Sequence, residues 1–427
     1  MPNQLEYRGV CRLMSERRNV LYLVHRVPYP PNRGDRIRSY HLLNYLSQRA
    51  NVYLATLADE PLEPGTLEVL QSRCAGVAVE SVTSLRWLQG AVHLLRGKSA
   101  TEGLFASSPL RAQIKAWTNQ ITFDAAVVFC SSMVQYLQAP QLAQVPTIVD
   151  LVDVDSQKFY DYAAASRGIK RWLYQWEGSR LRALECSLPA HVKAITLVSE
   201  AEANIFREFC PNTQTHAVKN GVDLAYFQPS ARAPQPQRCV FVGAFDYRPN
   251  IDGAVWFCHE IWPQVKSQFP AATLALVGRK PDPAVQKLAA IPGVEVIGSV
   301  PDVRPHVAQA EVVVVPLRIA RGIQNKVLEA MAMRKPVLAS AQAMEGLTVQ
   351  PGQEIAVAQT TMQWIEQLAA LFQNAERRQQ LAAAGEAYVQ REHDWGSCLH
   401  PFDTLLNLTA DEPRLVSECS TSTRTHC

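Results

Sequence analysis

The amino-acid sequence predicts an α/β protein made of two doubly wound domains. Three observations support this prediction: the length of the chain, the alternation of strand-like and helix-like segments, and one proline-rich break between two such series. The chain has 427 residues, whereas a single hydrophobic core stops growing at roughly 250–300 residues. Two domains are therefore expected.

Short apolar runs rich in β-branched residues recur along the chain and are predicted to be strands. Some are apolar throughout, such as VVVV at 312–315, which is typical of strands buried on both faces of a parallel sheet. In the first half of the chain the predicted strands are 19–24, 52–57, 77–82, 125–129, 147–152, 194–198 and 216–219. In the second half they are 239–242, 272–277, 294–297, 311–315, 336–339 and 355–358.

Helix-like segments separate many of these strands, which is the pattern of Rossmann-like folds. The clearest are 36–49, 251–268, 282–290 and 322–334. The polar, Pro-rich stretch 229–237 is predicted to link a first domain (19–228) to a second domain (238–385). The remaining predicted segments are an N-terminal extension (1–18), one crossover helix (386–408) and a disordered, Ser/Thr-rich tail (409–427).

Composition excludes several classes of protein. The net charge is only +3 and no nucleic-acid-binding module is recognisable, so no nucleic-acid partner is expected. The ten cysteines form no CxxC pair, which argues against a zinc site or a disulfide framework and favours free thiols in a reducing compartment. The sequence shows neither a signal peptide nor a membrane-spanning apolar run, and a cytoplasmic location is expected.

Ligands of open parallel sheets bind beside the carboxyl ends of the strands, so the loops that follow the strands are the first candidates for a site. The loop after the first strand, PYPPNRGDR at 28–36, leads into a predicted helix whose N-terminus would attract an anion. Gly34 would let a ligand approach the backbone closely, and Arg33 precedes it. A plain strand-to-helix turn is the alternative interpretation.

The loop after the VVVV strand holds the densest set of candidate residues. Arg318 and Arg321 lie in this loop, and Gly322 ends it just before a predicted helix. Lys326 and Glu329 are three residues apart and therefore share one face of that helix. The positive end of the helix together with these cations would hold a diphosphate, and Glu329 would accept hydrogen bonds from a ribose diol. A solvated Glu–Lys pair is the alternative.

Five stretches of the sequence resemble the retaining family 4 (group 1) glycosyltransferases of the GT-B fold. They are LVSEAEANIF (197–206), NGVDLAYFQP (220–229), FVGAFDYRPNIDG (241–253), VIGSVPDVRPHVAQAEVVVVP (296–316) and KVLEAMAMRKPVLAS (326–340). The likeness covers residues 19–405. Two further stretches are similar to the sugar transferases of bacterial PEP-CTERM/exosortase and exopolysaccharide loci, namely RVPYPPNRGDRIRSYHLLNYL (26–46) and DLVDVDSQKFYDYA (150–163).

The resemblance implies a first, acceptor-side domain that faces a second, donor domain across a cleft, and a metal-independent transfer with retention. A UDP- or GDP-sugar would bind through Gly34, Gly243, Arg248, Val300, Arg318, Gly322 and Ile323. Catalysis would depend on Lys326, Glu329 and Arg321. No metal or other cofactor is expected.

The sequence departs from the family pattern at three positions of the donor domain. Arg321 stands where the family's E-x7-E pattern has its first Glu, so Arg321 is expected to serve the diphosphate instead. Ala244 and Pro249 replace the usual Arg and Lys after the first strand of the second domain.

On the acceptor side the candidates are Arg33, Asp153 and Asp155. The triplet Asp153-Val-Asp155 matches the DxD metal motif of a different glycosyltransferase fold. We therefore expect these carboxylates to orient the acceptor or cap the next helix and not to hold a metal. Many relatives keep a His after the strand that corresponds to 125–129, and here two serines at 131–132 follow it.

Two segments mix Trp and Leu with Arg and Lys, as helices that lie in a membrane interface do. They are 84–98 and 169–182, and ordinary amphipathic helices packed on a core are the alternative. In the membrane interpretation the protein is peripheral at the cytoplasmic face of the inner membrane, and its acceptor is a lipid-linked saccharide.

The expected function is therefore the transfer of a hexosyl or related group from a nucleotide sugar to a saccharide acceptor in exopolysaccharide or cell-surface glycan synthesis. Two alternatives are kept. One is a nucleotide-sugar epimerase of the same fold. The other is a non-catalytic nucleotide-sugar-binding protein, which the missing Glu and the missing basic pair favour.

Overall fold

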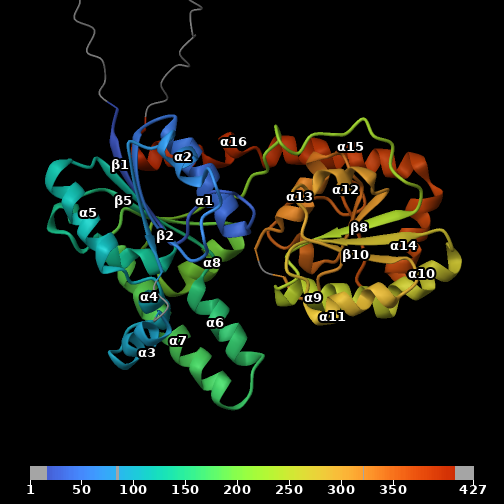
Figure 1. The fold of residues 1–427 in the computed structure, drawn as a ribbon, viewed down its shortest axis with the longest axis horizontal. Coiled ribbons are helices and arrows are strands. Elements are labelled where there is room, and N and C mark those ends of the chain that lie inside the picture. Colours follow the sequence, from blue (N-terminus) through green and yellow to red (C-terminus); the bar gives the residue numbers. More distant parts are fainter. Residues whose placement is uncertain (1–16, 83–85, 321, 409–427) are drawn as a thin grey trace, which may run out of the picture.

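The computed structural model describes residues 17–82, 86–320 and 322–408. Figure 1 shows two α/β domains side by side, each built on a sheet of parallel strands flanked by helices. The prediction of two doubly wound α/β domains is thus confirmed. The predicted tail, Arg321 and all but the last two residues of the predicted extension lie outside the described residues.

The first domain contains a seven-stranded sheet in the order β3-β2-β1-β4-β5-β6-β7. Its strands are β1 (Asn19–Val24), β2 (Asn51–Ala58), β3 (Gly76–Ser81), β4 (Ala125–Phe129), β5 (Thr147–Val152), β6 (Ala194–Leu197) and β7 (Thr215–Ala217). The chain adds β2 and β3 on one side of β1 and then β4 on the other, so the strand order reverses between β1 and β4.

Both faces of this sheet are covered, because alternate side chains of β1 enter two different cores. Val20 and Tyr22 belong to the core that includes residues of α1 (Gly34–Ser47). Leu21 and Leu23 belong to the core that includes residues of α5 (Ser108–Gln120). This burial on two sides is the physical reason for the nearly unbroken apolar run in the strand.

The second domain contains a six-stranded sheet in the order β10-β9-β8-β11-β12-β13. Its strands are β8 (Arg238–Val242), β9 (Thr273–Val277), β10 (Val294–Gly298), β11 (Val312–Val315), β12 (Val337–Ala339) and β13 (Ala356–Val357). Here the strand order reverses between β8 and β11. All thirteen predicted strands are present, with ends that differ by at most two residues from those expected.

Helices connect these strands. The other helices of the first domain are α2 (Thr66–Gln71), α3 (Arg86–Leu95), α4 (Ala100–Leu104), α6 (Asp155–Ala164), α7 (Gly168–Ser187) and α8 (Glu200–Phe209). Those of the second are α9 (Arg248–Trp256), α10 (Trp262–Gln268), α11 (Pro283–Gln286), α12 (Arg304–Gln309), α13 (Asn325–Ala332), α14 (Thr361–Gln373) and α15 (Ala375–Glu392).

Two helices differ from the prediction. The predicted helix 251–268 is interrupted by a π turn, η4 (Phe257–Ile261), between α9 and α10. The helix predicted at 322–334 begins only at Asn325.

After α15 the chain returns to the first domain through α16 (Trp395–Leu399) and α17 (Pro401–Leu406). Trp395 and Phe402 are buried in the first-domain core beside α1. The Trp395 ring stacks on His41 with 4.7 Å between the ring centroids. The end of the chain therefore ties the two domains together.

This returning segment differs from the single helix predicted at 386–408. The helical backbone breaks at His393 and Asp394, and Asp394 starts a new helix by accepting a hydrogen bond from the Ser397 N–H at 2.9 Å. An N-cap of this kind satisfies one of the free amides at the start of a helix. The break lets the chain turn from one domain onto the other.

Candidate functional site

The loops that follow β8 and β11 meet where the strand order of the second sheet reverses. The two strands are hydrogen-bonded neighbours, with Val312 opposite Cys239. Residues 243–247 and 316–324 extend from their carboxyl ends. Ligands of doubly wound sheets bind at such reversal points, so this is the expected donor position.

Two glycines allow the loops here to approach each other closely. A Cβ added to Gly278 would lie 1.6 Å from the Gly243 carbonyl oxygen, and a Cβ added to Gly243 would lie 2.9 Å from Asn250 Nδ2. Asn250 is buried, and its Nδ2 donates to the Ala244 carbonyl at 2.8 Å. Gly243 is one of the predicted donor-binding residues. Because it has no side chain, Gly278 and Asn250 can pack directly against it.

Lys326 is held at the start of α13 by that same asparagine. Its Nζ donates to Asn250 Oδ1 at 2.7 Å and lies 5.6 Å from the centroid of the Phe241 ring. The first turn of α13 contains no acidic residue, so the positive helix end is not neutralised from within the helix. The structure thus combines a fixed cation with a helix N-terminus, which suits a phosphate group.

Burial moves the pKa values of Lys326 and Glu329 toward each other. It lowers the pKa of Lys326 to about 8 and raises the pKa of Glu329 to about 7, while the attraction between the two charges partly opposes both shifts. Both side chains are half-buried on the face of α13 that the sequence predicted.

The other donor-side candidates lie around this pair in different environments. Arg318 forms two hydrogen bonds to Asp252 on α9, at 2.9 and 2.7 Å, so its charge is already matched at the surface. Arg248 is exposed at the first position of α9. Val300 and Ile323 pack on or within the second-domain core. Lys326 and Arg318 thus bind two different residues of α9, Asn250 and Asp252.

Gly322 brings this loop against the first domain. Its φ is +64°, and a Cβ added there would lie 3.1 Å from Asp153 Oδ1. Asp153, an acceptor-side candidate, thus lies directly opposite the donor loop. Gly34, in contrast, is exposed at the start of α1, and an added Cβ would meet no described atom within 4 Å.

Replacing Gly322 by alanine is expected to lower the free energy of unfolding by about 1–2 kcal/mol, because a residue with a Cβ is strained at this positive φ. Gly34→Ala serves as the matched control, since its backbone is helical and its surroundings are open. Thermal unfolding of the two variants measures the difference. Equal stability of the two would contradict the loop conformation.

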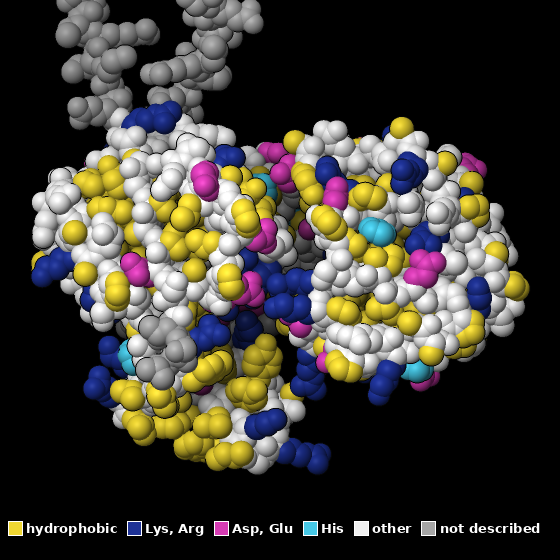
Figure 2. Space-filling model, in the orientation of Figure 1, with side chains coloured by type: hydrophobic (Ala, Val, Ile, Leu, Met, Phe, Trp, Pro, Cys, Tyr) yellow, Lys and Arg dark blue, Asp and Glu magenta, His cyan; other side chains and the backbone are white. Residues whose placement is uncertain are grey.

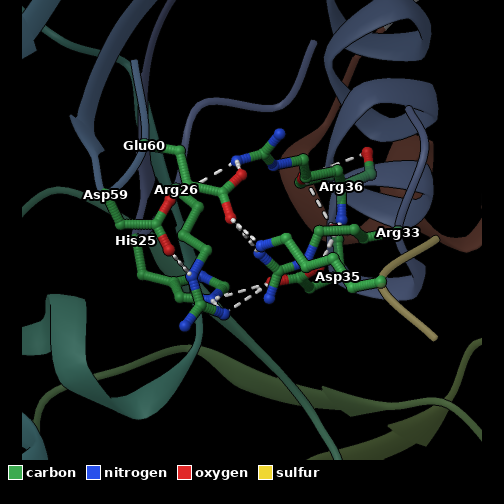
Figure 3. Close-up of polar contacts among 9 residues, drawn as sticks. His25, Arg26, Arg33, Asp35, Arg36, Asp59 and Glu60 are labelled. Atoms are coloured by element: carbon green, nitrogen blue, oxygen red, sulfur yellow. Dashed lines mark hydrogen bonds and ion pairs between the residues drawn. The ribbon is translucent and has the colours of Figure 1, made fainter. Parts of the chain in front are cut away.

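The first domain contributes a cluster of charged side chains, drawn in Figure 3. Arg26, just after β1, donates to Asp35 and to Asp59, each at 2.7 Å. Arg36 lies 3.4 Å from Asp59 and 3.3 Å from Glu60. The cluster joins the carboxyl ends of β1 and β2 to the start of α1.

Arg33 is held less tightly in this cluster than its neighbours. Its nearest carboxylate oxygens, on Asp35 and Glu60, are both 3.7 Å away. Lys280, from the loop after β9 in the second domain, reaches Glu60 at 3.6 Å. The cluster therefore faces the second domain, and Figure 2 shows Lys and Arg side chains gathered where the two domains meet.

His25 lies at the base of this cluster, at the carboxyl end of β1. Its ring stacks on Phe129 at the end of β4, with centroids 5.8 Å apart, and its Nε2 is 3.4 Å from Asp35 Oδ2. Burial lowers the pKa of His25. Among the described residues Nδ1 of His25 finds no hydrogen-bond partner. A histidine therefore lies beside the end of β4, but it comes from the end of β1 and not from the loop after β4.

Asp35 remains ionised in this setting. Burial by itself would raise its pKa, but the hydrogen bond with His25 and the charges of Arg26 and Arg33 hold the pKa of Asp35 well below its usual range. A carboxylate fixed in this way orients both the imidazole and the guanidinium beside it.

A buried ion pair fixes α1 over the carboxyl ends of the strands. The guanidinium of Arg38 donates to both carboxylate oxygens of Asp150, at 2.8 and 3.0 Å, and both side chains are fully buried. Arg38 also donates to the Val218 carbonyl and to Asn220 Oδ1. Asn220 Nδ2 in turn donates to Asn325 Oδ1 at the start of α13, so the network reaches the second domain.

Asp155 lies in the first turn of α6 and accepts a hydrogen bond from Ser131 Oγ at 2.8 Å. It is not the cap of the helix, because Val154 holds that position. Across residues 17–82, 86–320 and 322–408 no group of three or more His, Cys, Asp or Glu side chains is arranged to hold a metal ion.

Reading the sequence missed several residues of this site, namely His25, Arg26, Asp59, Glu60, Asn250 and Lys280. Most of them directly follow a strand. The rule that ligands bind beside the carboxyl ends of parallel strands, which led to Lys326, would therefore also have found them. Their partners are far away in sequence, and their pairing could not be deduced from spacing.

Comparisons with known proteins agree with this architecture. Residues 236–374, which span most of the second domain, match the family model described as Glycosyl transferases group 1. No curated protein sequence matches the chain significantly.

Solved structures match nearly the whole chain. Sucrose-phosphate synthase from Thermosynechococcus elongatus is 18% identical, with a TM-score of 0.69 over 92% of this chain and 98% of that one. HepE from Anabaena, in complex with UDP and glucose, is 14% identical, with a TM-score of 0.63 over 91% and 99%. WaaG, a glycosyltransferase involved in lipopolysaccharide biosynthesis, is 16% identical, with a TM-score of 0.62 over 90% and 99%. The fold is therefore GT-B, as the sequence predicted.

Proposed function

We propose that the protein is a retaining, metal-independent glycosyltransferase that moves a hexosyl or related group from a UDP- or GDP-sugar to a saccharide acceptor. The observation that carries the proposal is Lys326, fixed by Asn250 at the positive end of α13 and beside the strand-order reversal of the second sheet. When the bond from the anomeric carbon to the diphosphate breaks, negative charge develops on the leaving oxygen. A fixed cation and helix-end amides stabilise that charge.

Similar proteins support the choice of donor. HepE was solved in complex with UDP and glucose and also in complex with UDP-glucose, and the second domain matches a glycosyltransferase family. In the proposed complex Lys326 neutralises the diphosphate and Glu329, three residues further on the same face, accepts hydrogen bonds from the ribose. Gly243 and Gly278 let the loops at the floor of the site pack against each other and against Asn250, which holds Lys326.

The acceptor would approach from the first domain, where Asp153 borders the donor loop and Arg33 lies in the charged cluster that faces Lys280 of the second domain. Its hydroxyl oxygen would form the new bond on the same face of the sugar from which the diphosphate leaves, and the hydroxyl proton would pass to the departing diphosphate. Because the chain resembles transferases of exopolysaccharide loci and the fold is shared with WaaG of lipopolysaccharide biosynthesis, we propose a role in cell-surface glycan synthesis.

A thermal-shift panel of nucleoside-diphosphate sugars tests this proposal, because a ligand that binds only the folded state raises its stability. The donor that shifts the melting temperature is then incubated alone with the protein and followed by NMR. Slow hydrolysis of the donor supports a transferase, whereas an isomerised sugar would identify an epimerase. Binding with neither hydrolysis nor transfer would identify a non-catalytic protein.

Donor affinity is expected to be highest between about pH 7 and pH 8. Below this range Glu329 becomes protonated and loses one acceptor for the ribose diol. Above it Lys326 loses its proton and with it the attraction for the diphosphate. Calorimetric titration across this range measures the profile. Glu329→Gln should lose the acidic limb and keep the basic one, and an unchanged acidic limb would contradict the assignment.

A further inference from the structure

The first domain carries a helical lobe, formed by α3, α4, α6 and α7, that extends away from its sheet (Figure 1). More than half of the large hydrophobic side chains that are exposed among the described residues belong to this lobe. The most exposed are Leu95 (81%), Trp87 (69%), Ile169 (69%), Leu88 (63%) and Trp172 (54%), which we call the apolar face of the lobe. The exposed large hydrophobic side chains outside the lobe are Leu62, Leu67, Tyr226, Tyr247, Ile319 and Met362.

The spacing within α3 and within α7 places the exposed apolar side chains on one side of each helix. Leu88 and Leu95 are seven residues apart on α3, and Ile169 and Trp172 are three apart on α7, so each pair lies on one side of its helix. The opposite side of α3 packs through glycine. A Cβ added to Gly103 of α4 would lie 2.7 Å from the Gln89 carbonyl oxygen of α3.

Glu177 joins α7 to the start of α4. Its buried carboxylate accepts hydrogen bonds from Ser99 Oγ at 2.7 Å, from the Ala100 N–H at 2.7 Å and from the Thr101 N–H at 2.9 Å. A carboxylate at a helix N-terminus is stabilised by the helix dipole. Because α3 packs on α4, this bond keeps α3 and α7 in one lobe, and both present exposed apolar residues.

The two segments that carry the apolar face have charged side chains of one sign only. Residues 86–101 and 165–176 contain no Asp or Glu. The cations of these two segments are Arg86, Arg96, Lys98, Arg167, Lys170 and Arg171. Figure 2 shows hydrophobic side chains gathered over this lobe with Lys and Arg at its edges. A surface of this kind complements a flat partner that has an anionic outer layer over an apolar interior.

We propose that the apolar face of the lobe docks on an anionic lipid bilayer. Trp and Leu would enter the interface while Arg and Lys contact the lipid phosphates, as interfacial helices do. In the part of the chain that the structure describes, no helix is long and apolar enough to cross a bilayer. The lobe therefore lies on the membrane and does not span it.

Docking would bring the cleft within reach of the bilayer. Helix α6 starts at Asp155, two residues after Asp153 at the cleft, and its ten residues run about 15 Å into the lobe. The acceptor would then be a saccharide carried on a lipid. This last step rests on the proposed function, whereas docking does not.

Co-sedimentation of the full chain with vesicles tests the proposal. We expect binding to vesicles of phosphatidylcholine with phosphatidylglycerol, weaker binding to phosphatidylcholine alone, and loss of binding at high salt. Lys170→Glu with Arg171→Glu should weaken binding by roughly tenfold or more. Trp87→Ser with Trp172→Ser should weaken it at every salt concentration.

The control variants are Leu67→Ser on α2 and Met362→Ser on α14, which remove exposed apolar side chains outside the lobe (40% and 61% exposed). They should bind vesicles as the unchanged chain does. An equal loss in the controls, or the same binding to both vesicle types at all salt concentrations, would overturn the proposal. So would self-association in ultracentrifugation that the Trp variants abolish in a chain that binds no vesicles, because a second copy would then cover the face.

Donor hydrolysis in the absence of vesicles separates this proposal from the proposed function. The Trp87→Ser, Trp172→Ser variant should hydrolyse the donor at the unchanged rate and melt at the unchanged temperature. Vesicle binding by a chain that neither binds nor hydrolyses any nucleotide sugar would support docking and contradict transfer. Transfer by a chain that binds no vesicles would support the function and contradict docking.

Discussion

Replacing Lys326 by methionine is expected to lower kcat/KM for the nucleotide-sugar donor by about 100- to 1000-fold, the cost of removing one fixed donor that stabilises charge in a transition state. Methionine keeps the aliphatic part of the side chain and removes the charge. Asn250 Oδ1 loses its partner at the same time, so the melting temperature is measured with the kinetics. Lys326→Arg, which keeps the cation, should recover part of the activity.

Two other cations test whether the effect is local. Lys287 is exposed in the same domain, and Lys287→Met should leave kcat/KM unchanged. Arg318 lies in the loop that precedes α13 but is held by Asp252, so Arg318→Met should have a much smaller effect than Lys326→Met. Comparable losses at Lys326 and Lys287 would contradict the proposed site.

Replacing Arg38 by methionine is expected to lower the free energy of unfolding by about 3–5 kcal/mol, because Asp150 would remain buried and charged without its partner. Both side chains are fully buried, and the only other side chain hydrogen-bonded to Asp150 within the described residues is Thr196, at 3.0 Å. Denaturant unfolding measures the loss.

The double variant Arg38→Met, Asp150→Leu provides the control. It removes both charges together, so its loss of stability should be smaller than the sum of the two single losses. Strict additivity would show that the ion pair does not account for the effect. Activity of the double variant is also informative, because Arg38 links α1 through Asn220 to the start of α13.

The ends of the strands could be predicted from the sequence to within two residues. Both sheets are parallel and covered on both faces, so their strands are apolar at nearly every position and end where polar residues begin. The VVVV run at 312–315 is β11 itself. The positions of Lys326 and Glu329 on one face of α13 likewise follow from helical periodicity, which is a local property.

Prediction was less successful where an outcome depends on a distant partner. The assignment of Arg318 to the diphosphate stays a prediction, whereas its ion pair with Asp252, 66 residues away, could not be inferred from the sequence. The final helix was expected to be continuous, but Asp394 breaks it where the chain turns onto the first domain. Neither Asp252 nor the surface of the first domain that receives the end of the chain can be inferred from the spacing of neighbouring residues.

The sequence by itself determined the α/β class, the strands and the helix face that carries Lys326 and Glu329, because strand and helix periodicities are encoded in neighbouring residues. Only the tertiary structure decided which charges are matched, that Asn250 fixes Lys326, that His25 stacks beside β4, and that α3 and α7 belong to one exposed lobe. These outcomes depend on contacts between segments far apart in the chain, and such contacts exist only when both sheets and the connections between them are folded.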